Sequence, residues 1–416
     1  MDEMIMTKMF DFTYSEARTC GQEAYDASLV DDSWMSSQER QLYESAMHLI
    51  PVLQQREKDC ITARSLPDET FADFQRLGLP RILQPMLYGG FEGSTTLLSR
   101  IVEDLSVACP SSGWVLAVYG EHAWMAASFA KQAQDEIWLE NQQAVVASSL
   151  APRATAEIVE GGYRVTGTYP FASGCKHALW LVLGVFVQNG ESREMRYMLV
   201  PKHDVEILDD WETLGLRGTG SNTLLLDNVF IPDHRTVVDK SLQTGDTPGS
   251  KVHPDYALLR APRQVFSTFT QLPVTLGLGR RVLNHVCQTM QGRVSRGTTN
   301  LQDSQIVQLK IGEAAADLNA AITVAHRRQQ YTHERMKRGL ELGQRDVFAC
   351  RRDSVWANSM ARQSIEKLIS ITSAEIVHNR NDLQSWYRDA LTTGTHFSAN
   401  WESAMVPYGK FQLGLI

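Results

Sequence analysis

In mid-chain the sequence reads Leu214-Gly215-Leu216-Arg217-Gly218-Thr219-Gly220-Ser221, and a strand-like apolar run from Thr223 to Phe230 follows it. The two closely spaced glycines of this stretch are similar to part of a dinucleotide-binding fingerprint, which requires a strand, a glycine turn and then a helix. Because a strand follows here instead of a helix, the local order argues against that interpretation. We therefore expect a loop that leads into another strand.

The middle of the chain, residues 143–253, has the composition of a β domain. Short runs rich in Val, Ile, Leu, Thr and Tyr are separated by Gly, Pro or Asn, which is typical of strands and turns. Gly161-Gly162 lies between two of these runs and predicts a tight hairpin. We expect roughly six to eight strands in a barrel or sandwich. The runs are Val145 to Leu150, Thr155 to Val159, Tyr163 to Thr168, Leu179 to Val187, Met195 to Val200 and Thr223 to Phe230.

Helical patterns lie on both sides of this domain, so the predicted class is α+β. In residues 37–142, a short amphipathic helix begins after Pro67 and ends at Gly78, Ser94 caps a second helix, and Pro110 begins a third. Residues 254–416 predict a C-terminal four-helix bundle. Its helices should span about 264–291, 303–338, 345–379 and 382–392, after a polar loop at 236–253. Residues 1–36 are interpreted as an N-terminal arm.

Composition excludes several classes of function. The 416 residues carry a net charge of −8 without a basic stripe, which argues against nucleic acid and an anionic membrane surface as partners. The six cysteines lie far apart without a C-x-x-C pair, as expected for reduced thiols in a cytoplasmic protein. The longest apolar run, Ala178 to Val187, is too short to cross a bilayer. We expect a small-molecule partner.

One histidine stands out near the C-terminus. The chain reads Arg388-Asp389-Ala390-Leu391-Thr392-Thr393-Gly394-Thr395-His396, followed by Phe397. Histidine has the side-chain pKa closest to neutral pH, so a histidine at a helix end that faces a pocket suits proton transfer. We interpret His396 as such a group, and a surface or structural histidine is the alternative. His122, on an apolar helix with Trp114, is either a pocket residue or a core histidine.

A second candidate segment is Tyr169-Pro170-Phe171-Ala172-Ser173-Gly174. Its proline and small residues would let a planar ring approach the backbone, with the Ser173 hydroxyl free to form a hydrogen bond, although an ordinary β turn is the alternative. Ser148-Ser149 lacks an adjacent base and a G-x-S-x-G elbow, which argues against a serine hydrolase. The histidines do not cluster at metal-ligand spacing, so no metal site is predicted. Arg293 and Arg296 are either phosphate ligands or solvated surface residues.

From about Ser37 to the C-terminus, the three-part plan and these motifs resemble the acyl-CoA dehydrogenase fold. Leu214 to Ser221 followed by Asp227-Asn228-Val229-Phe230-Ile231-Pro232 is similar to that family's exit from its β domain, and Arg388-Asp389 resembles the Arg-Asp before its active-site loop. The dehydrogenases place a catalytic Glu in a Tyr-Glu-Gly-Thr loop after this pair, where His396-Phe397 stands here. With Cys109-Pro110-Ser111-Ser112-Gly113-Trp114 and Pro170 to Gly174, that difference resembles the flavin-dependent monooxygenase branch, the oxygenase components of two-component aromatic hydroxylases.

The resemblance implies that a separate flavin reductase supplies reduced FAD or FMN, which reacts with O2 to form a C4a-hydroperoxide that hydroxylates a phenol or an indole. Ser173 would act near the flavin N5, and His396 would act on the ring OH or NH of the aromatic substrate. The resemblance also implies cofactor contacts from Phe171, Ser149, Arg293 and Arg296, and a substrate pocket with His122, Trp114 and Phe397. A homotetramer or dimer is expected. The alternatives are an acyl-CoA dehydrogenase or related flavin oxidase, and a non-catalytic helical scaffold.

Overall fold

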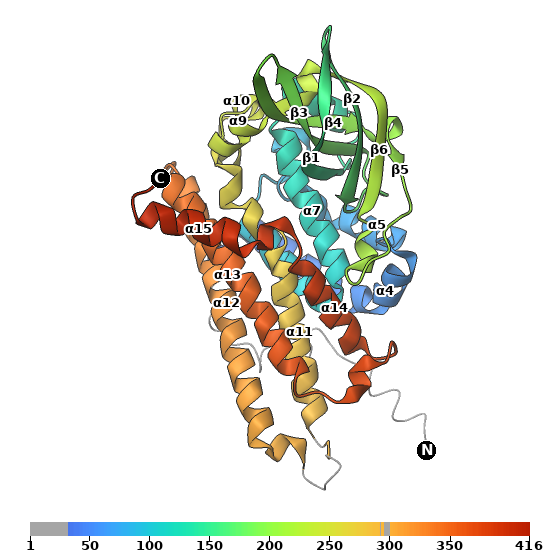
Figure 1. Ribbon diagram of the computed structural model, residues 1–416, viewed down its shortest axis with the longest axis vertical. Coiled ribbons are helices and arrows are strands. Elements are labelled where there is room, and N and C mark those ends of the chain that lie inside the picture. Colours follow the sequence, from blue (N-terminus) through green and yellow to red (C-terminus); the bar gives the residue numbers. More distant parts are fainter. Residues whose placement is uncertain (1–31, 292, 295–299) are drawn as a thin grey trace.

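The computed structural model describes residues 32–291, 293–294 and 300–416, so residues 1–31 of the predicted arm and Arg296 lie outside the described residues. The described chain forms N-terminal helices, a central sheet and C-terminal helices, in that order. Figure 1 shows the sheet at one end of the molecule and the long helices α11, α12 and α13 extending toward the other end. Within the described residues, none of the helices has the length and apolar character needed to cross a membrane.

The N-terminal helices begin and end where local chemistry predicts. Gly78 ends α5 in the left-handed conformation, with a φ of 72°. The Ser94 hydroxyl accepts a hydrogen bond from the Leu97 N–H at the start of α6, and Pro110 begins α7. The helices are α3 (Ser37–Met47), α4 (Ile50–Ala63), α5 (Asp68–Leu77), α6 (Thr95–Ala108), α7 (Pro110–Ala127) and α8 (Lys131–Trp138).

Helix α7 is the centre of the structure. Every residue of α7 is buried, and the helix packs against α6, the C-terminal α11 and strand β1. In Figure 1 it descends from beneath the sheet into the helical part of the molecule. A helix that is apolar on all sides is stable only when other elements surround it. Its polar residues therefore face either partners or an internal cavity.

The predicted β domain is confirmed as a mixed sheet, which has seven strands among the described residues. The strand order is β5-β6-β2-β1-β3-β4-β7, with β1 and β3 parallel and the other pairs antiparallel. The predicted hairpin is confirmed by the pair Val159 and Gly162, with Gly161 at a φ of 77°. The strands are β1 (Val146–Val159), β2 (Gly162–Ala172), β3 (Trp180–Asn189), β4 (Ser192–Pro201), β5 (Glu206–Ile207), β6 (Asn222–Pro232) and β7 (Thr236–Val238).

Two irregularities in this sheet matter for the site. The runs predicted at Val145 to Leu150 and Thr155 to Val159 are one strand, β1, whose register with β3 shifts between Ser149 and Ala154. Near the end of β2, the register with β6 shifts between Tyr169 and Ala172. Such bulges redirect side chains and often border functional sites. The segment interpreted as a possible β turn is thus the bulged end of β2.

The C-terminal helices confirm the bundle but correct its boundaries. The helix predicted from 264 begins at Leu272, because Pro273 is tolerated in the first turn of a helix and not in its interior. The helix predicted to reach 379 ends at Ile369, where the hydroxyls of Ser370 and Thr372 hydrogen-bond backbone carbonyls. The helices are α11 (Leu272–Met290), α12 (Gln305–Lys337), α13 (Gln344–Ile369), α14 (Asp382–Thr393) and α15 (Trp401–Gln412).

Three short helices were not predicted. The segment 236–253, expected to be a polar loop, contains β7, α9 (Asp239–Thr244) and α10 (Pro248–Val252). Thr247 and Ser250 form a reciprocal capping box that nucleates α10. Helix α15 contains Pro407, which obscured its pattern, although the Asn400 side chain caps it by accepting from the Ser403 N–H.

Candidate active site

A cavity of about 470 Å³ lies between α7, the bulged ends of β1 and β2, and the segment that follows α14. Helix α7 forms one wall. Trp114, Val118, Glu121 and His122 recur at helical spacing, and all four line the cavity. The size is that of a small-molecule site, and the lining combines apolar surface with a few polar groups.

The opposite wall comes from the two strand bulges. The Ser149 hydroxyl donates to the Pro170 carbonyl oxygen at 2.7 Å and so ties β1 to the bulge of β2. Phe171 has a φ of 66°, a left-handed conformation that is costly for an aromatic residue, and its side chain is 66% exposed at the rim of the cavity. Its ring meets the Trp211 ring edge-on, with centroids 6.1 Å apart.

Ser173 takes part in a chain of hydrogen bonds that begins at Trp114. The Trp114 indole N–H donates to the Ser173 hydroxyl at 3.1 Å, and the Ser173 and Ser221 hydroxyls lie 2.7 Å apart. Ser221 lies 2.7 Å from the Thr219 hydroxyl, which donates to the Leu216 carbonyl. Because Thr219 uses its proton on the Leu216 carbonyl, Ser221 donates to Thr219. Ser173 therefore accepts from Trp114 and donates to Ser221. One lone pair of the Ser173 hydroxyl remains for a ligand N–H.

His122 is held as a neutral imidazole. Its Nδ1 lies 3.2 Å from the Val146 carbonyl oxygen, which can only accept, so Nδ1 carries the proton. Nε2 therefore accepts from the Ser148 hydroxyl at 2.8 Å. Burial lowers the pKa of His122 to about 4, because the apolar interior disfavours the imidazolium form. His122 thus belongs to the cavity and is not a core histidine.

His396 also lines the cavity, in contact with Trp114 of α7. Its Nδ1 accepts hydrogen bonds from the Ser398 backbone N–H at 3.3 Å and the Ser398 hydroxyl at 2.7 Å. The ring proton is therefore on Nε2. The ring packs edge-on against Trp114, with centroids 5.4 Å apart and planes at 85°. Burial lowers the pKa of His396 to about 4, so the ring is neutral at physiological pH and offers Nε2–H as a donor.

Two segments distant in sequence position His396. The Asp389 carboxylate accepts a hydrogen bond from the Leu216 N–H at 2.6 Å. Gly215 lies against the backbone carbonyl of Arg388, and any Cβ there would overlap with it. The loop after Gly215 and the end of α14 are therefore in direct contact, which fixes where the following His396 segment begins. Burial raises the pKa of Asp389 to about 7.

Of the other predicted residues, Phe397 lies at the cavity and Arg293 does not. Phe397 lines the cavity at its mouth with a 70% exposed side chain. Arg293 does not line it and instead donates to the Ser373 hydroxyl at 2.8 Å in a separate pocket of about 50 Å³. A cofactor role for Arg293 thus has no support within one chain. Arg296 lies outside the described residues, so its predicted role stays a prediction.

The sequence interpretation missed Glu121. Of the described residues that line the cavity, Glu121 alone carries a carboxyl group. It is 8% exposed, and burial raises its pKa to about 7. The signal that could have identified it is its position seven residues after Trp114 and next to His122, on the same face of one helix.

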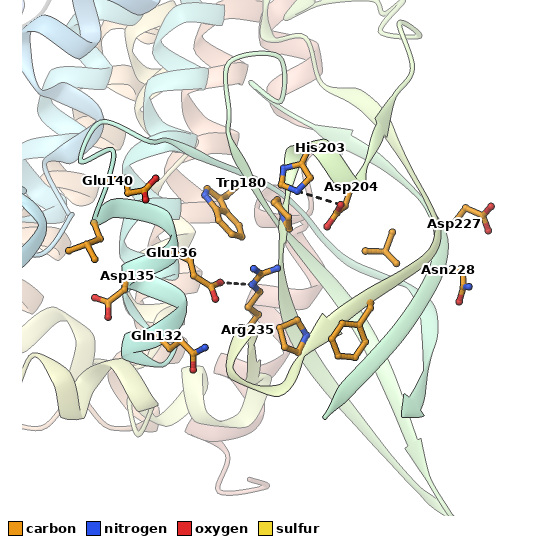
Figure 2. A pocket seen from close by; sticks show the side chains of 15 residues that line it. Gln132, Asp135, Glu136, Glu140, Trp180, His203, Asp204, Asp227, Asn228 and Arg235 are labelled. Carbon is orange, nitrogen blue, oxygen red and sulfur yellow. Dashed lines mark hydrogen bonds and ion pairs between the residues drawn. The ribbon is translucent and has the colours of Figure 1, made fainter. Parts of the chain in front are cut away.

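A larger open groove lies outside this site. It has a volume of about 1150 Å³ and lies between α8 and the strands (Figure 2). Glu136 in this groove accepts hydrogen bonds from Arg235 at 2.5 Å and from His234 at 2.8 Å. The groove is open to solvent, whereas the smaller cavity holds buried titratable groups of shifted pKa, which are typical of active sites. The candidate active site is therefore the cavity of about 470 Å³.

Comparison with known proteins agrees with this architecture. Two family models match, described as the N-terminal domain of acyl-CoA dehydrogenase over residues 40–144 and its C-terminal domain over residues 269–401. The oxygenase subunit HsaA of a flavin-dependent monooxygenase from Rhodococcus jostii is 31% identical over 369 residues, which cover 88% of this chain and 97% of HsaA.

Two further relatives carry flavin in their names. The oxygenase component of an FADH2-dependent resorcinol hydroxylase from Rhizobium sp. is 31% identical over 364 residues, 85% of this chain and 89% of the relative. The structure of XiaF from Streptomyces sp., in complex with FADH2 and glycerol, superimposes with a TM-score of 0.83 at 26% identity, covering 91% of this chain and 96% of XiaF.

Proposed function

Because this chain belongs to the flavin-dependent monooxygenases that share the acyl-CoA dehydrogenase fold, we propose that it is an oxygenase component that hydroxylates a phenol or an indole. The observation that carries the proposal is the cavity in which a neutral imidazole, His396, and the Ser173 hydroxyl both contact Trp114. A separate flavin reductase would supply the reduced flavin. The resorcinol hydroxylase and XiaF are both named with FADH2, which favours reduced FAD over reduced FMN.

The residues of the cavity fit a reduced flavin ring. Such a ring is flat and apolar on its faces and carries an N–H at its N5 edge, and the remaining lone pair of Ser173 suits such a donor. Phe171 at the rim offers an aromatic surface beside the ring. Ser149 supports the site through the Pro170 carbonyl rather than by facing the cavity with a free proton. The bound flavin activates O2, while the protein orients the reactants and excludes water.

The histidines have different roles in this proposal. His396 presents Nε2–H to the cavity and so acts as a hydrogen-bond donor, because its Nδ1 is occupied by Ser398. Ser148 donates to His122, which leaves the Ser148 oxygen free to accept a hydrogen bond from a substrate OH or NH. Such an interaction raises electron density on the aromatic ring, which favours its attack on an electrophilic oxygen.

We further propose that the chain assembles into a dimer or tetramer. Apolar side chains are exposed on α15 and the residues that follow it, and contiguous exposed apolar surface is typical of interaction sites. This surface would be covered by another copy, and Arg293 could then approach a cofactor held partly by a neighbouring subunit. A cytoplasmic location agrees with the free thiols of the described cysteines. The exposed side chains are Trp401, Val406, Leu413, Leu415 and Ile416.

The experiment compares product formed and peroxide released per NADH consumed, with a generic flavin reductase and a panel of phenols and indoles. His396→Ala should keep flavin binding but lower the yield of hydroxylated product about tenfold or more, since general acid and hydrogen-bond groups contribute at least this factor. His378→Ala, at an exposed position, serves as the control. Ser173→Ala should raise peroxide release even without substrate, because the flavin edge loses its hydroxyl partner.

An unchanged product yield in His396→Ala would contradict the assignment of His396. The alternatives from the sequence are tested in the same protein without O2. An acyl-CoA dehydrogenase would reduce its bound flavin with an acyl-CoA alone, whereas the proposed oxygenase requires the reductase. A non-catalytic scaffold would fail to bind reduced flavin in an anaerobic titration.

A further inference from the structure

Glu121 is a buried carboxyl group that the proposed mechanism does not use. It lies on the face of α7 that lines the cavity, beside His122 and seven residues after Trp114. Its side chain also borders a narrow space of about 10 Å³ lined by Phe266 and Phe269, so the carboxyl lies at an apolar end of the site. A carboxyl group at such a position is costly unless it serves a ligand or has strong partners.

The partners of Glu121 within the protein are weak. Thr270 donates a hydrogen bond to its carboxyl group. The cation that faces it from outside α7 is Arg263, of the short helix η9 (Arg263–Val265), but this guanidinium donates to the Tyr197 hydroxyl at 2.8 Å and lies 3.8 Å from the Asp239 carboxylate. Among the described residues no cation forms an ion pair with Glu121. Part of its hydrogen-bonding capacity is therefore left for a ligand.

The charges around this end of the cavity are few. On α7 itself the neighbouring titratable group is His122, which is neutral. His396, which also lines the cavity, is neutral too, and Arg153 of β1 lines it with an exposed side chain. A negative charge brought beside Glu121 would thus meet a carboxyl group that Arg263, already paired, does not compensate. Two carboxylates in one buried site cannot both ionise without a large cost.

We propose that Glu121 determines substrate specificity: it binds a second hydroxyl or N–H of an uncharged aromatic substrate, besides the group that donates to Ser148, and it excludes aromatic substrates that carry a carboxylate. This inference rests on the proposed function and narrows it to neutral phenols or indoles. The carboxyl group can accept from a substrate O–H or N–H in either protonation state. A buried hydrogen bond of this kind discriminates strongly between substrates with and without the hydroxyl or N–H, since a substrate that lacks this group leaves the Glu121 carboxyl unpaired.

The protonation of Glu121 should make the exclusion of a carboxylate substrate depend on pH. Burial raises its pKa to about 7, so the fraction of negatively charged Glu121 increases from about pH 6 to about pH 8. The groups that face it do not titrate in this range, because His122 and His396 have pKa values of about 4 and Arg263 stays charged. Exclusion of a carboxylate should therefore strengthen as the pH rises, while binding of a neutral phenol should change little.

The test uses two probes of similar size, resorcinol and 4-hydroxyphenylacetate, with the full-length wild-type protein, Glu121→Gln and the exposed control Glu140→Gln. Binding without turnover is measured by the quenching of tryptophan fluorescence at about pH 6 and pH 8, and KM and kcat are measured with reductase present. At about pH 8 wild type should prefer resorcinol by about tenfold or more, the factor that corresponds to one pKa unit of charge interaction, and the preference should be smaller at about pH 6. Glu121→Gln should reduce that preference to about twofold and abolish its pH dependence, whereas Glu140→Gln should behave as wild type.

Equal preference in wild type and Glu121→Gln, with hydroxylation intact, would overturn the role of Glu121 and leave the proposed function standing. A wild-type protein that binds 4-hydroxyphenylacetate equally well at both pH values would also overturn it, and this measurement does not depend on whether the variant folds. If wild type hydroxylates neither these probes nor any other aromatic compound, the proposed function fails together with the inference.

Discussion

The adjacent residues Glu121 and His122 should give the stability of this protein opposite pH dependences. Both side chains are at least nine-tenths buried, at 8% and 5% exposure. Burial raises the pKa of Glu121 from 4.5 to about 7 and lowers the pKa of His122 from 6.5 to about 4. Each shift disfavours the charged form, but the two charged forms appear at opposite ends of the pH range.

The signs follow from proton uptake. Between pH 7 and pH 5 the unfolded chain protonates the histidine at position 122 and the folded protein does not, so acidification costs about 2 kcal/mol of unfolding free energy. Over the same range the folded protein protonates Glu121 and the unfolded chain does so only slightly, which contributes about 2 kcal/mol in the stabilising direction. The two contributions nearly cancel in the wild type.

Single substitutions should therefore reveal the pH dependence of the unfolding free energy that each residue contributes. Relative to wild type, His122→Gln should gain about 2 kcal/mol of unfolding free energy on going from pH 7 to pH 5, and Glu121→Gln should lose about 2 kcal/mol. Contributions from other groups, such as the low pKa of His396 and the high pKa of Asp389, cancel in these differences because all three proteins share them. Urea unfolding followed by circular dichroism at several pH values gives the three curves.

Parallel curves for wild type and His122→Gln would refute the reasoning, because they would mean that His122 is protonated in the folded protein. That result would also remove the argument that Nε2 accepts from Ser148. The double substitution should restore a pH dependence close to that of wild type, because both titrating groups are then absent. If the unfolding free energy of the double variant still depended more strongly on pH than that of wild type, the two sites would be coupled to a third group.

Three further predictions concern residues that shape the cavity. Gly215→Ala should lower the unfolding free energy by about 2 kcal/mol or more, because its Cβ would overlap with the Arg388 carbonyl, whereas Gly312→Ala, in an open position on α12, should raise it by up to about 1 kcal/mol in the same denaturation assay. Phe171→Gly should relieve about 1 kcal/mol of left-handed strain yet weaken aromatic binding in a fluorescence titration, and unchanged binding would remove Phe171 from the site. Trp114→Phe should lower the unfolding free energy by about 1 kcal/mol, because Ser173 loses its indole donor. An unchanged unfolding free energy would argue against the series of hydrogen bonds from Trp114 to Leu216.

The order of the elements could be predicted from the sequence because it depends on local signals. Gly78 and Ser94 end and begin helices through their own backbone and side-chain chemistry, and Gly161 forms its hairpin in the same way. The boundaries at Pro273 and around Ser370 also have local causes, because proline fits the first turn of a helix and serine and threonine hydroxyls hydrogen-bond the carbonyls at its end. Pro407 obscured the pattern of α15, a helix that tertiary contacts with α13 support.

The sequence by itself determined the three-part plan and placed His396, Ser173, His122 and Trp114 among the candidates, because periodicity and short motifs are local properties of the chain. Only the tertiary structure decided that Asp389 meets the Leu216 N–H, a contact between residues 173 positions apart. Packing likewise decided which ring nitrogen of each histidine is protonated and that Glu121 faces the cavity. Contacts between distant segments, and the desolvation that they cause, depend on how whole elements pack, and local sequence preference carries no information about them.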